Sequence, residues 1–150
     1  MDWILQKATE LGVAAIVPVA SERSEVRLDG ERAEKRAAHW RNVVVSACEQ
    51  SGRARIPDVA APCALADALA NLPAMRLLLD PEATQPLPSD IIDNACALAI
   101  GPEGGWSPSD IATLGAAGFV GSRLGPRVLR TETAGIAAIA ALQARHGDFA

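Results

Sequence analysis

A glycine-rich turn constrains the fold of this chain more than any other feature of its sequence. Residues 101–106 read Gly-Pro-Glu-Gly-Gly-Trp and follow the apolar run 96–100. The next residues, Ser107 and Pro108, are typical of a helix start, because serine caps helix N-termini and proline is favoured in the first turn. A buried strand is therefore expected to end in a tight turn that leads into a helix, which is the repeating unit of α/β proteins.

The same alternation recurs along the chain of 150 residues. Hydrophobic periodicity and Gly/Pro boundaries predict buried strands at residues 13–19, 75–79 and 96–100, a short strand at 119–124, and helices at residues 2–11, 31–50, 65–72, 107–117 and 131–145. Strands that alternate with helices predict an α/β fold, a mostly parallel sheet with helices on both faces. A chain of this length normally forms one domain. At 49% hydrophobic and 3% aromatic, its core must consist of Ala, Val, Leu and Ile.

Composition excludes several classes of protein. No apolar run approaches the ~20 residues of a membrane helix, and the N-terminus lacks the basic start and cleavage site of a signal peptide. The three cysteines form no C-x-x-C pair and predict reduced thiols in a cytoplasmic protein. The two histidines, His39 and His146, lie far apart in the sequence, so neither a zinc site nor a Ser-His-Asp triad is expected.

Two interpretations of the glycine turn stay open from the residues alone. Ligands of α/β proteins collect at the carboxyl ends of strands, and three glycines leave the backbone unshielded there. The turn lacks the Gly-Lys-Ser/Thr of a phosphate loop and the spacing of a dinucleotide turn. A backbone-lined pocket for a neutral or zwitterionic ligand therefore fits better than a phosphate cradle. The alternative is a tight connection without a ligand.

A second segment, residues 124–134, combines glycine with arginine. Pro126 stiffens the loop, and Thr131 is expected to cap the last helix. Arg127 and Arg130 flank an apolar pair beside this helix start, where they suit a phosphate or a developing anion; solvated surface arginines are the alternative. The net charge of −4 argues against nucleic acid, yet residues 41–55 and 123–133 each contain three arginines and one glutamate.

These segments resemble the signatures of the RsmE family of 16S ribosomal RNA uridine methyltransferases. Residues 101–106 match its Gly-Pro-Glu-Gly-Gly-aromatic motif, and residues 124–134 match its Leu-Gly-x-Arg-Ile-Leu-Arg-x-Glu-Thr-Ala motif with Val128 in place of Ile. Upstream, residues 6–13 (Gln-Lys-Ala-Thr-Glu-Leu-Gly-Val), residues 21–24 (Ser-Glu-Arg-Ser) and residues 40–57 resemble further blocks of the family. In the last block, Ser46-Ala47-Cys48 stands where an acidic run is usual.

The resemblance implies a SPOUT-class methyltransferase domain with a C-terminal trefoil knot and a homodimer formed by knot-side helices. It also implies S-adenosylmethionine as cofactor and methylation at N3 of a uridine in 16S ribosomal RNA of the small ribosomal subunit, in the cytoplasm. Family members carry an N-terminal PUA-like RNA-binding domain and a strand before the first helix. Residues 1–150 are therefore expected to be the methyltransferase domain alone. Two alternatives are an inactive fragment that binds cofactor or dimerises but needs that RNA-binding domain, and a related knotted transfer RNA methyltransferase.

The resemblance also implies roles for individual residues. Arg130, with Arg23, is expected to stabilise charge on the uracil carbonyls, and Glu132 is the candidate proton acceptor. RNA is expected to contact Arg23, Arg53, Arg127 and Arg130. The cofactor is expected to lie against Leu78, Leu79, Ile100, Gly101, Pro102, Glu103, Gly104, Gly105, Leu124, Gly125, Leu129, Thr133 and Ala134.

Overall fold

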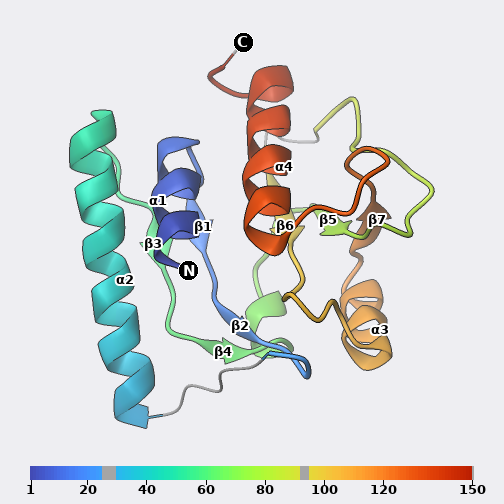
Figure 1. Cartoon of the computed structure of the whole chain (residues 1–150), viewed down its shortest axis with the longest axis horizontal. Helices are drawn as coiled ribbons and strands as arrows, with labels where there is room; N and C mark the ends of the chain where they lie inside the picture. The colour runs from blue at the N-terminus through green and yellow to red at the C-terminus, as the bar shows by residue number, and fades with distance from the viewer. Residues whose placement is uncertain (25–29, 92–94, 150) are drawn as a thin grey trace.

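The computed structural model describes residues 1–24, 30–91 and 95–149 and confirms an α/β fold (Figure 1). Every paired strand among these residues is parallel to its neighbour. The elements, in chain order, are α1 (Asp2–Glu10), β1 (Ala15–Ile16), β2 (Val19–Ala20), α2 (Gly30–Ser51), β3 (Asp58–Val59), β4 (Cys63–Ala64), the 3-10 turn η1 (Asp67–Leu69), β5 (Met75–Leu79), β6 (Cys96–Ala99), α3 (Pro108–Ala116), β7 (Val120–Ser122) and α4 (Thr131–His146).

The strands form three small sheets rather than one continuous sheet. β1 pairs with β3, β2 pairs with β4, and β5 lies between β6 and β7. The predicted buried strand at residues 13–19 is wrong, because Val17 and Pro18 separate β1 from β2 and Val17 is exposed. Proline has no N–H for a strand ladder, although its carbonyl here accepts the N–H of Cys63 at 3.1 Å. Residues 60–62, which end in Pro62, separate β3 from β4.

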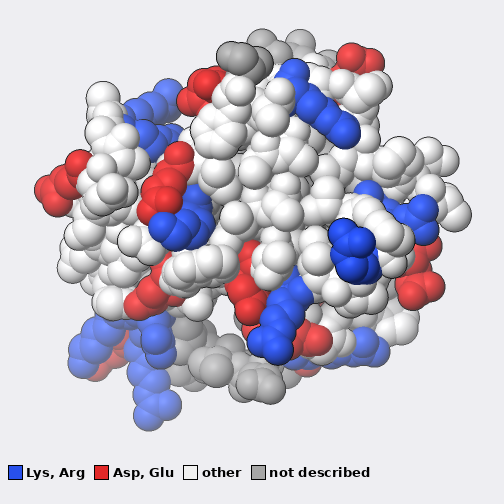
Figure 2. All heavy atoms as spheres, turned by 45° about the horizontal axis from the view of Figure 1, so that its top comes forward, with Lys and Arg blue, Asp and Glu red and all other residues white. Residues whose placement is uncertain are grey.

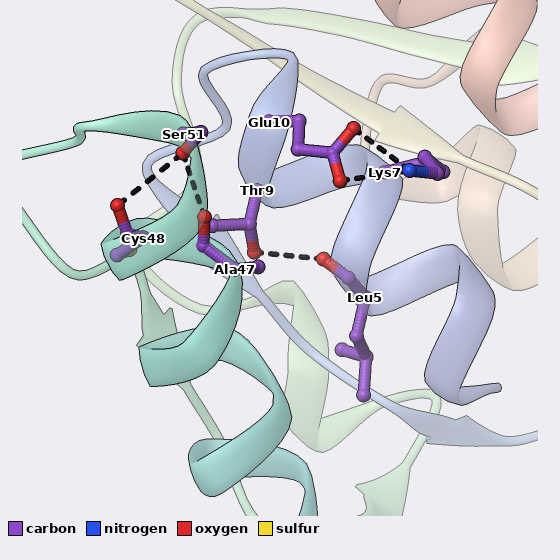
Figure 3. Close-up of polar contacts among 7 residues, drawn as sticks. All are labelled: Leu5, Lys7, Thr9, Glu10, Ala47, Cys48 and Ser51. Carbon is purple, nitrogen blue, oxygen red and sulfur yellow. Dashed lines mark hydrogen bonds and ion pairs between the residues drawn. The ribbon is translucent and has the colours of Figure 1, made fainter.

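Helices α1 and α2 pack against each other and form the first core (Figure 3). Leu5, Trp40 and Val44 are buried in this core, and Trp40 and Val44 recur at helical spacing along α2. Thr9 is fully buried, and its hydroxyl donates to the carbonyl of Leu5 at 2.7 Å. Lys7 forms an ion pair with Glu10 at 2.8 Å. The block at residues 6–13 is therefore engaged in packing and in local contacts of α1.

The second core lies around β5, β6 and β7. On one side, Leu77 and Leu87 pack with Ala138 and Leu142 of α4; on the other, Leu78 packs with Trp106 and Leu114 near α3. Figure 1 shows α4 in front of β6 and α3 at the foot of β7. Gln143 of α4 donates to the carbonyl of Leu11 at 2.7 Å, which joins the two halves of the molecule.

The helix predicted at residues 65–72 is wrong, since this segment contains only η1. Asn71 adopts a positive φ of 55°, and Pro73 disfavours helix at the residue before it. The predictions for β5 and for α4 agree with the structure, and residues 81–90 lie in a loop. No helix in the described ranges combines the length and the apolar character needed to cross a membrane.

Candidate functional site

The glycine turn follows β6 and folds back on itself. The N–H of Gly105 donates to the carbonyl of Pro102 at 2.8 Å, and Gly105 has a φ of +69°, a conformation that favours glycine. A Cβ atom at Gly101 would lie 3.2 Å from Cδ1 and Nε1 of Trp106, whose side chain is buried in the second core. The turn thus rests on the Trp106 indole, and a side chain at position 101 would require the indole or the turn to shift.

The start of α3, directly after the turn, is closed by its own side chains. Ser107 accepts the N–H of Asp110 at 3.0 Å, and Asp110 accepts the N–H of Ser107 at 3.2 Å, which is a complete capping box. The N–H groups of Ser107 and Asp110 are therefore satisfied, and the Asp110 carboxyl at this helix start disfavours binding of an anion there. That the glycine turn itself is no phosphate cradle stays a prediction.

Residues 21–24, far away in the sequence, lie against the glycine turn. Nη1 of Arg23 donates to the carbonyl of Gly104 at 3.0 Å, and a Cβ atom at Gly104 would lie 3.4 Å from Cβ of Arg23. Ser21 is buried; its N–H donates to Oγ of Ser24 at 3.1 Å, and the two hydroxyls lie 2.8 Å apart. These bonds make a tight turn that places Arg23 on Gly104.

Helix α4 reaches the other end of the glycine turn through Thr131. The prediction that Thr131 caps this helix is wrong: Arg130 occupies the N-cap position and no side chain caps the helix. Thr131 is the first helical residue, and its hydroxyl donates to the carbonyl of Gly101 at 3.0 Å. The glycine turn is therefore held at Gly101 by Thr131 and at Gly104 by Arg23.

The predicted apolar site residues differ in their accessibility. Leu78 is buried in the second core, whereas Leu79, Ile100, Leu124 and Leu129 are half-buried. Pro102 and Ala134 are also half-buried; Glu103, Gly104, Gly105, Gly125 and Thr133 are exposed. Cδ1 of Ile100 lies 3.0 Å from the position that a Cβ atom at Gly135 would take. Gly135, which the sequence analysis missed, allows α4 to approach the end of β6 this closely.

The predicted RNA-binding arginines differ in their surroundings. Arg127 and Arg130 are exposed on the segment before α4, and Glu132 is half-buried in the first turn of that helix. Arg53 instead donates to the carbonyls of Thr9 and Val13, each at 2.8 Å, and joins the ends of α1 and α2. Figure 1 places these helix ends away from the glycine turn. Arg53 thus stabilises the first core, and this geometry gives no support to its predicted contact with RNA.

The charges on the face drawn in Figure 2 are dispersed. Lysine and arginine side chains form separate groups with uncharged surface between them, and acidic side chains lie beside several of them.

Burial raises the pKa of the Cys96 thiol, and burial together with Asp67 raises the pKa of the Cys63 thiol. Both thiols therefore stay protonated at neutral pH and are poor nucleophiles. Over the described ranges, no three His, Cys, Asp or Glu side chains gather as metal ligands.

Two grooves lie elsewhere on the molecule. One of about 530 Å³ is lined by β1, β3 and α2, and one of about 540 Å³ is lined by β5, β7 and the loop at residues 85–89. Neither contains a residue of the glycine turn. We place the candidate site at the turn, because exposed backbone there is held from two sides by side chains distant in sequence.

Fold and site together define an α/β domain with an exposed glycine turn at the carboxyl end of a parallel strand, the position where α/β proteins commonly bind ligands. The chain belongs to the RNA methyltransferase domain family, whose model matches residues 1–143. This match confirms the family resemblance found in the sequence motifs.

Individual relatives agree with this assignment. Ribosomal RNA small subunit methyltransferase E of Buchnera aphidicola subsp. Schizaphis graminum is 39% identical over 160 residues, covering 99% of this chain and 62% of the relative. The enzyme of the same name from Mycobacterium tuberculosis is also 39% identical, covering 94% of this chain and 57% of its own length. The structure of this enzyme from Neisseria gonorrhoeae, bound to S-adenosyl methionine, superposes with a TM-score of 0.89 at 48% identity over 99% of this chain and 63% of that one. The chain spans about three fifths of the length of these relatives.

Proposed function

We propose that this domain binds S-adenosylmethionine and transfers its methyl group to N3 of a uridine in small-subunit ribosomal RNA. The observation that carries the proposal is the glycine turn in a chain of the RNA methyltransferase domain family. Arg23 and Thr131 hold this turn by hydrogen bonds to its backbone carbonyls. The similar Neisseria gonorrhoeae enzyme was solved with S-adenosyl methionine bound.

The residues of the turn suit this cofactor. Gly104 and Gly105 are exposed, and the N–H of Gly104 and the carbonyl of Gly105, which Pro102 and Arg23 do not engage, can bind the polar edges of a zwitterionic ligand without charged side chains. Half-buried Ile100, Leu124 and Leu129 offer apolar contact for its adenosine portion. When bound, S-adenosylmethionine supplies an electrophilic methyl group. The remaining residues proposed to contact it are Leu78, Leu79, Gly101, Pro102, Glu103, Gly125, Thr133 and Ala134.

The chemistry of the acceptor requires a base and a stabilised anion. N3 of uridine is a poor nucleophile until its proton leaves, and the resulting charge spreads over the two carbonyls. Glu132, in the first turn of α4, is the proposed proton acceptor, and exposed Arg130 at the N-cap is the proposed charge-stabilising group. Arg23 is proposed to hold the glycine turn and to present its remaining N–H groups to RNA, and Arg127 to bind a phosphate.

Two partners belong to the proposal. One is the small ribosomal subunit, which places the protein in the cytoplasm. The other is a second copy of this chain, because α4 carries apolar side chains around most of its surface and Ile136 and Ile139 remain only half-buried. Light scattering on the 15.6 kDa chain tests this homodimer, and a monomer at all concentrations would exclude it.

A second candidate function is favoured by chain length. Because the chain spans about three fifths of its relatives, the domain on its own is a candidate for cofactor binding and dimerisation without RNA methylation. Methyl transfer to small subunits, measured with the chain alone and with a relative of full length in parallel, separates the two functions.

The central experiment combines calorimetry with mass spectrometry of RNA. Arg130→Ala is expected to abolish methyl transfer to unmethylated small subunits and to leave the Kd for S-adenosylmethionine within about twofold, since the side chain is exposed and acts on RNA. Arg32→Ala, an exposed arginine in the first turn of α2, is the matched control and is expected to retain activity. Lost cofactor binding in Arg130→Ala would refute the RNA-side role of this residue.

A further inference from the structure

Val128 is the most exposed large hydrophobic residue in the described part of the chain. Val128 is 80% exposed, compared with 58% for Val120 on the edge strand β7. An exposed valine on its own needs no explanation. Val128, however, protrudes from the segment between β7 and α4, directly beside the proposed site, and between two exposed arginines.

The segment that carries Val128 is anchored at both ends. Before it, Leu124 packs into the second core and Gly125 adopts a φ of +74°, followed by Pro126 with its restricted backbone. After it, the hydroxyl of Thr131 is bonded to the carbonyl of Gly101. Because the chain is fixed on both sides, the exposure of Val128 is a property of the fold.

The flanking charges identify the chemistry of a partner. Arg127 precedes Val128, Arg130 follows two residues later, and both are exposed. Guanidinium groups bind phosphates, and an apolar group between them suits the face of a nucleobase. A twofold contact centred on Val128 would instead bring the arginines of two copies together, which like charges disfavour.

We propose that Val128 is a nucleobase-contacting residue. In the RNA complex its isopropyl group packs against the face of a base at or beside the target uridine, while Arg127 and Arg130 bind the neighbouring phosphates. The inference rests on the proposed function and deepens it. An enzyme that acts on a ring nitrogen needs the base out of its stack, and an apolar side chain can occupy the space next to it.

Methyl NMR tests this contact without an activity assay. The chain is labelled with 13C in its valine methyl groups, and the Val128 signals are assigned from the spectrum of Val128→Ala. S-adenosylhomocysteine is added first to fill the cofactor site, followed by a short RNA hairpin with a uridine-only loop. We expect the Val128 methyl signals to move upfield only on addition of RNA, because a stacked base imposes a ring-current shift, while the Val120 signals stay in place.

Other outcomes overturn the inference in distinguishable ways. If S-adenosylhomocysteine alone shifts Val128 and RNA adds nothing, the residue covers the cofactor. If fluorescence polarisation shows that the hairpin binds but Val128 does not move, RNA binds without this contact and the proposed function survives. If neither ligand binds, the proposed function fails together with the inference.

Isosteric substitution provides the second measurement. Val128→Thr keeps the branched shape and replaces one methyl group with a hydroxyl, so hairpin binding is expected to weaken roughly threefold to tenfold. Val128→Ile is expected to retain binding, and Val120→Thr is the matched control with no effect. Unchanged hairpin affinity in Val128→Thr would refute the contact.

Discussion

Replacing Gly101 with alanine tests whether the glycine turn depends on its contact with Trp106. The new Cβ atom would lie 3.2 Å from Cδ1 and Nε1 and 3.5 Å from Cε2 of the indole. Trp106 is 9% exposed and packs against Leu65, Leu78 and Leu114, so the ring has little freedom to move away. Either the indole or the turn must shift by a few tenths of an ångström.

The magnitude follows from the cost of overpacking a core. Inserting a methyl group into a packed interior destabilises a protein by about 1–3 kcal/mol. For a domain of this size, a loss of about 2 kcal/mol lowers Tm by roughly 4–8 °C. Because the same shift displaces the carbonyl that Thr131 binds, the affinity for S-adenosylmethionine is expected to fall by about tenfold, equivalent to ~1.4 kcal/mol.

The assay has a matched control within the same chain. Gly115 lies in the last turn of α3, and a Cβ atom there would meet no other atom within 4 Å. Gly115→Ala is therefore expected to leave cofactor affinity unchanged and to stabilise the domain by up to about 1 kcal/mol, since glycine is a poor helix former. Thermal unfolding by circular dichroism and calorimetric titration measure both variants. A Gly101→Ala domain with unchanged Tm and unchanged affinity would refute the reasoning.

Three further predictions concern other contacts of the described residues. Thr131→Val removes the hydroxyl that donates to the Gly101 carbonyl. Calorimetry is expected to show severalfold weaker cofactor binding, and the free energy of unfolding is expected to fall by about 1 kcal/mol. Thr131→Ser is expected to retain both the cofactor affinity and the stability. Arg53→Ala leaves the carbonyls of Thr9 and Val13 without this donor. The free energy of unfolding, measured with a denaturant, is expected to fall by about 2–4 kcal/mol, with cofactor affinity unchanged. Arg53→Lys should be intermediate, because an ammonium group cannot bind both oxygens in the forked geometry of a guanidinium group. The hydrogen bond from His39, 2.6 Å from Asp2, lowers the pKa of this exposed carboxyl from its ordinary value of 3.8. A carboxyl with a lowered pKa stabilises the folded state at pH values above its unfolded pKa, and this stability is lost as the pH falls through the folded pKa. Wild type and Asp2→Asn should therefore differ in urea unfolding at pH 6 and converge well below pH 3.8. A stability difference that persists in acid would contradict this assignment.

Helices and strands that depend on local sequence patterns were predicted correctly, whereas strands that depend on pairing with distant residues were missed. β5 was predicted with its observed bounds, and α4 to within one residue of its end, because each carries a local apolar pattern with clear Gly or Pro boundaries. β3 and β4 were missed as strands. Each is two residues long, and their residues, Asp58, Val59, Cys63 and Ala64, show no alternating pattern. Their strand geometry comes from pairing with β1 and β2, which are distant in sequence.

In the candidate site, too, features with a local sequence signal were predicted, and contacts between distant residues were not. The glycine turn was predicted because glycine spacing after an apolar run is a local signal. The contacts of Arg53 within the fold could not be predicted, because its positive charge is visible in the sequence but the two carbonyls that it binds, more than 35 residues earlier, are not. Thr131 was assigned to the wrong bond for a similar reason: its hydroxyl has an acceptor 30 residues away, and local capping rules consider only the adjacent helix.

The sequence by itself determined the α/β class, the family and the position of the glycine turn, because periodicity, turn residues and motif spacing act over short stretches of chain. Only the tertiary structure decided how the turn is held: Arg23 reaches Gly104 across 81 residues, and Trp106 supports Gly101 from the second core. Such contacts depend on how the packed elements bring distant side chains within hydrogen-bonding distance, and no local pattern encodes that distance. The same holds for Val128, whose exposure follows from the anchoring of its segment on both sides.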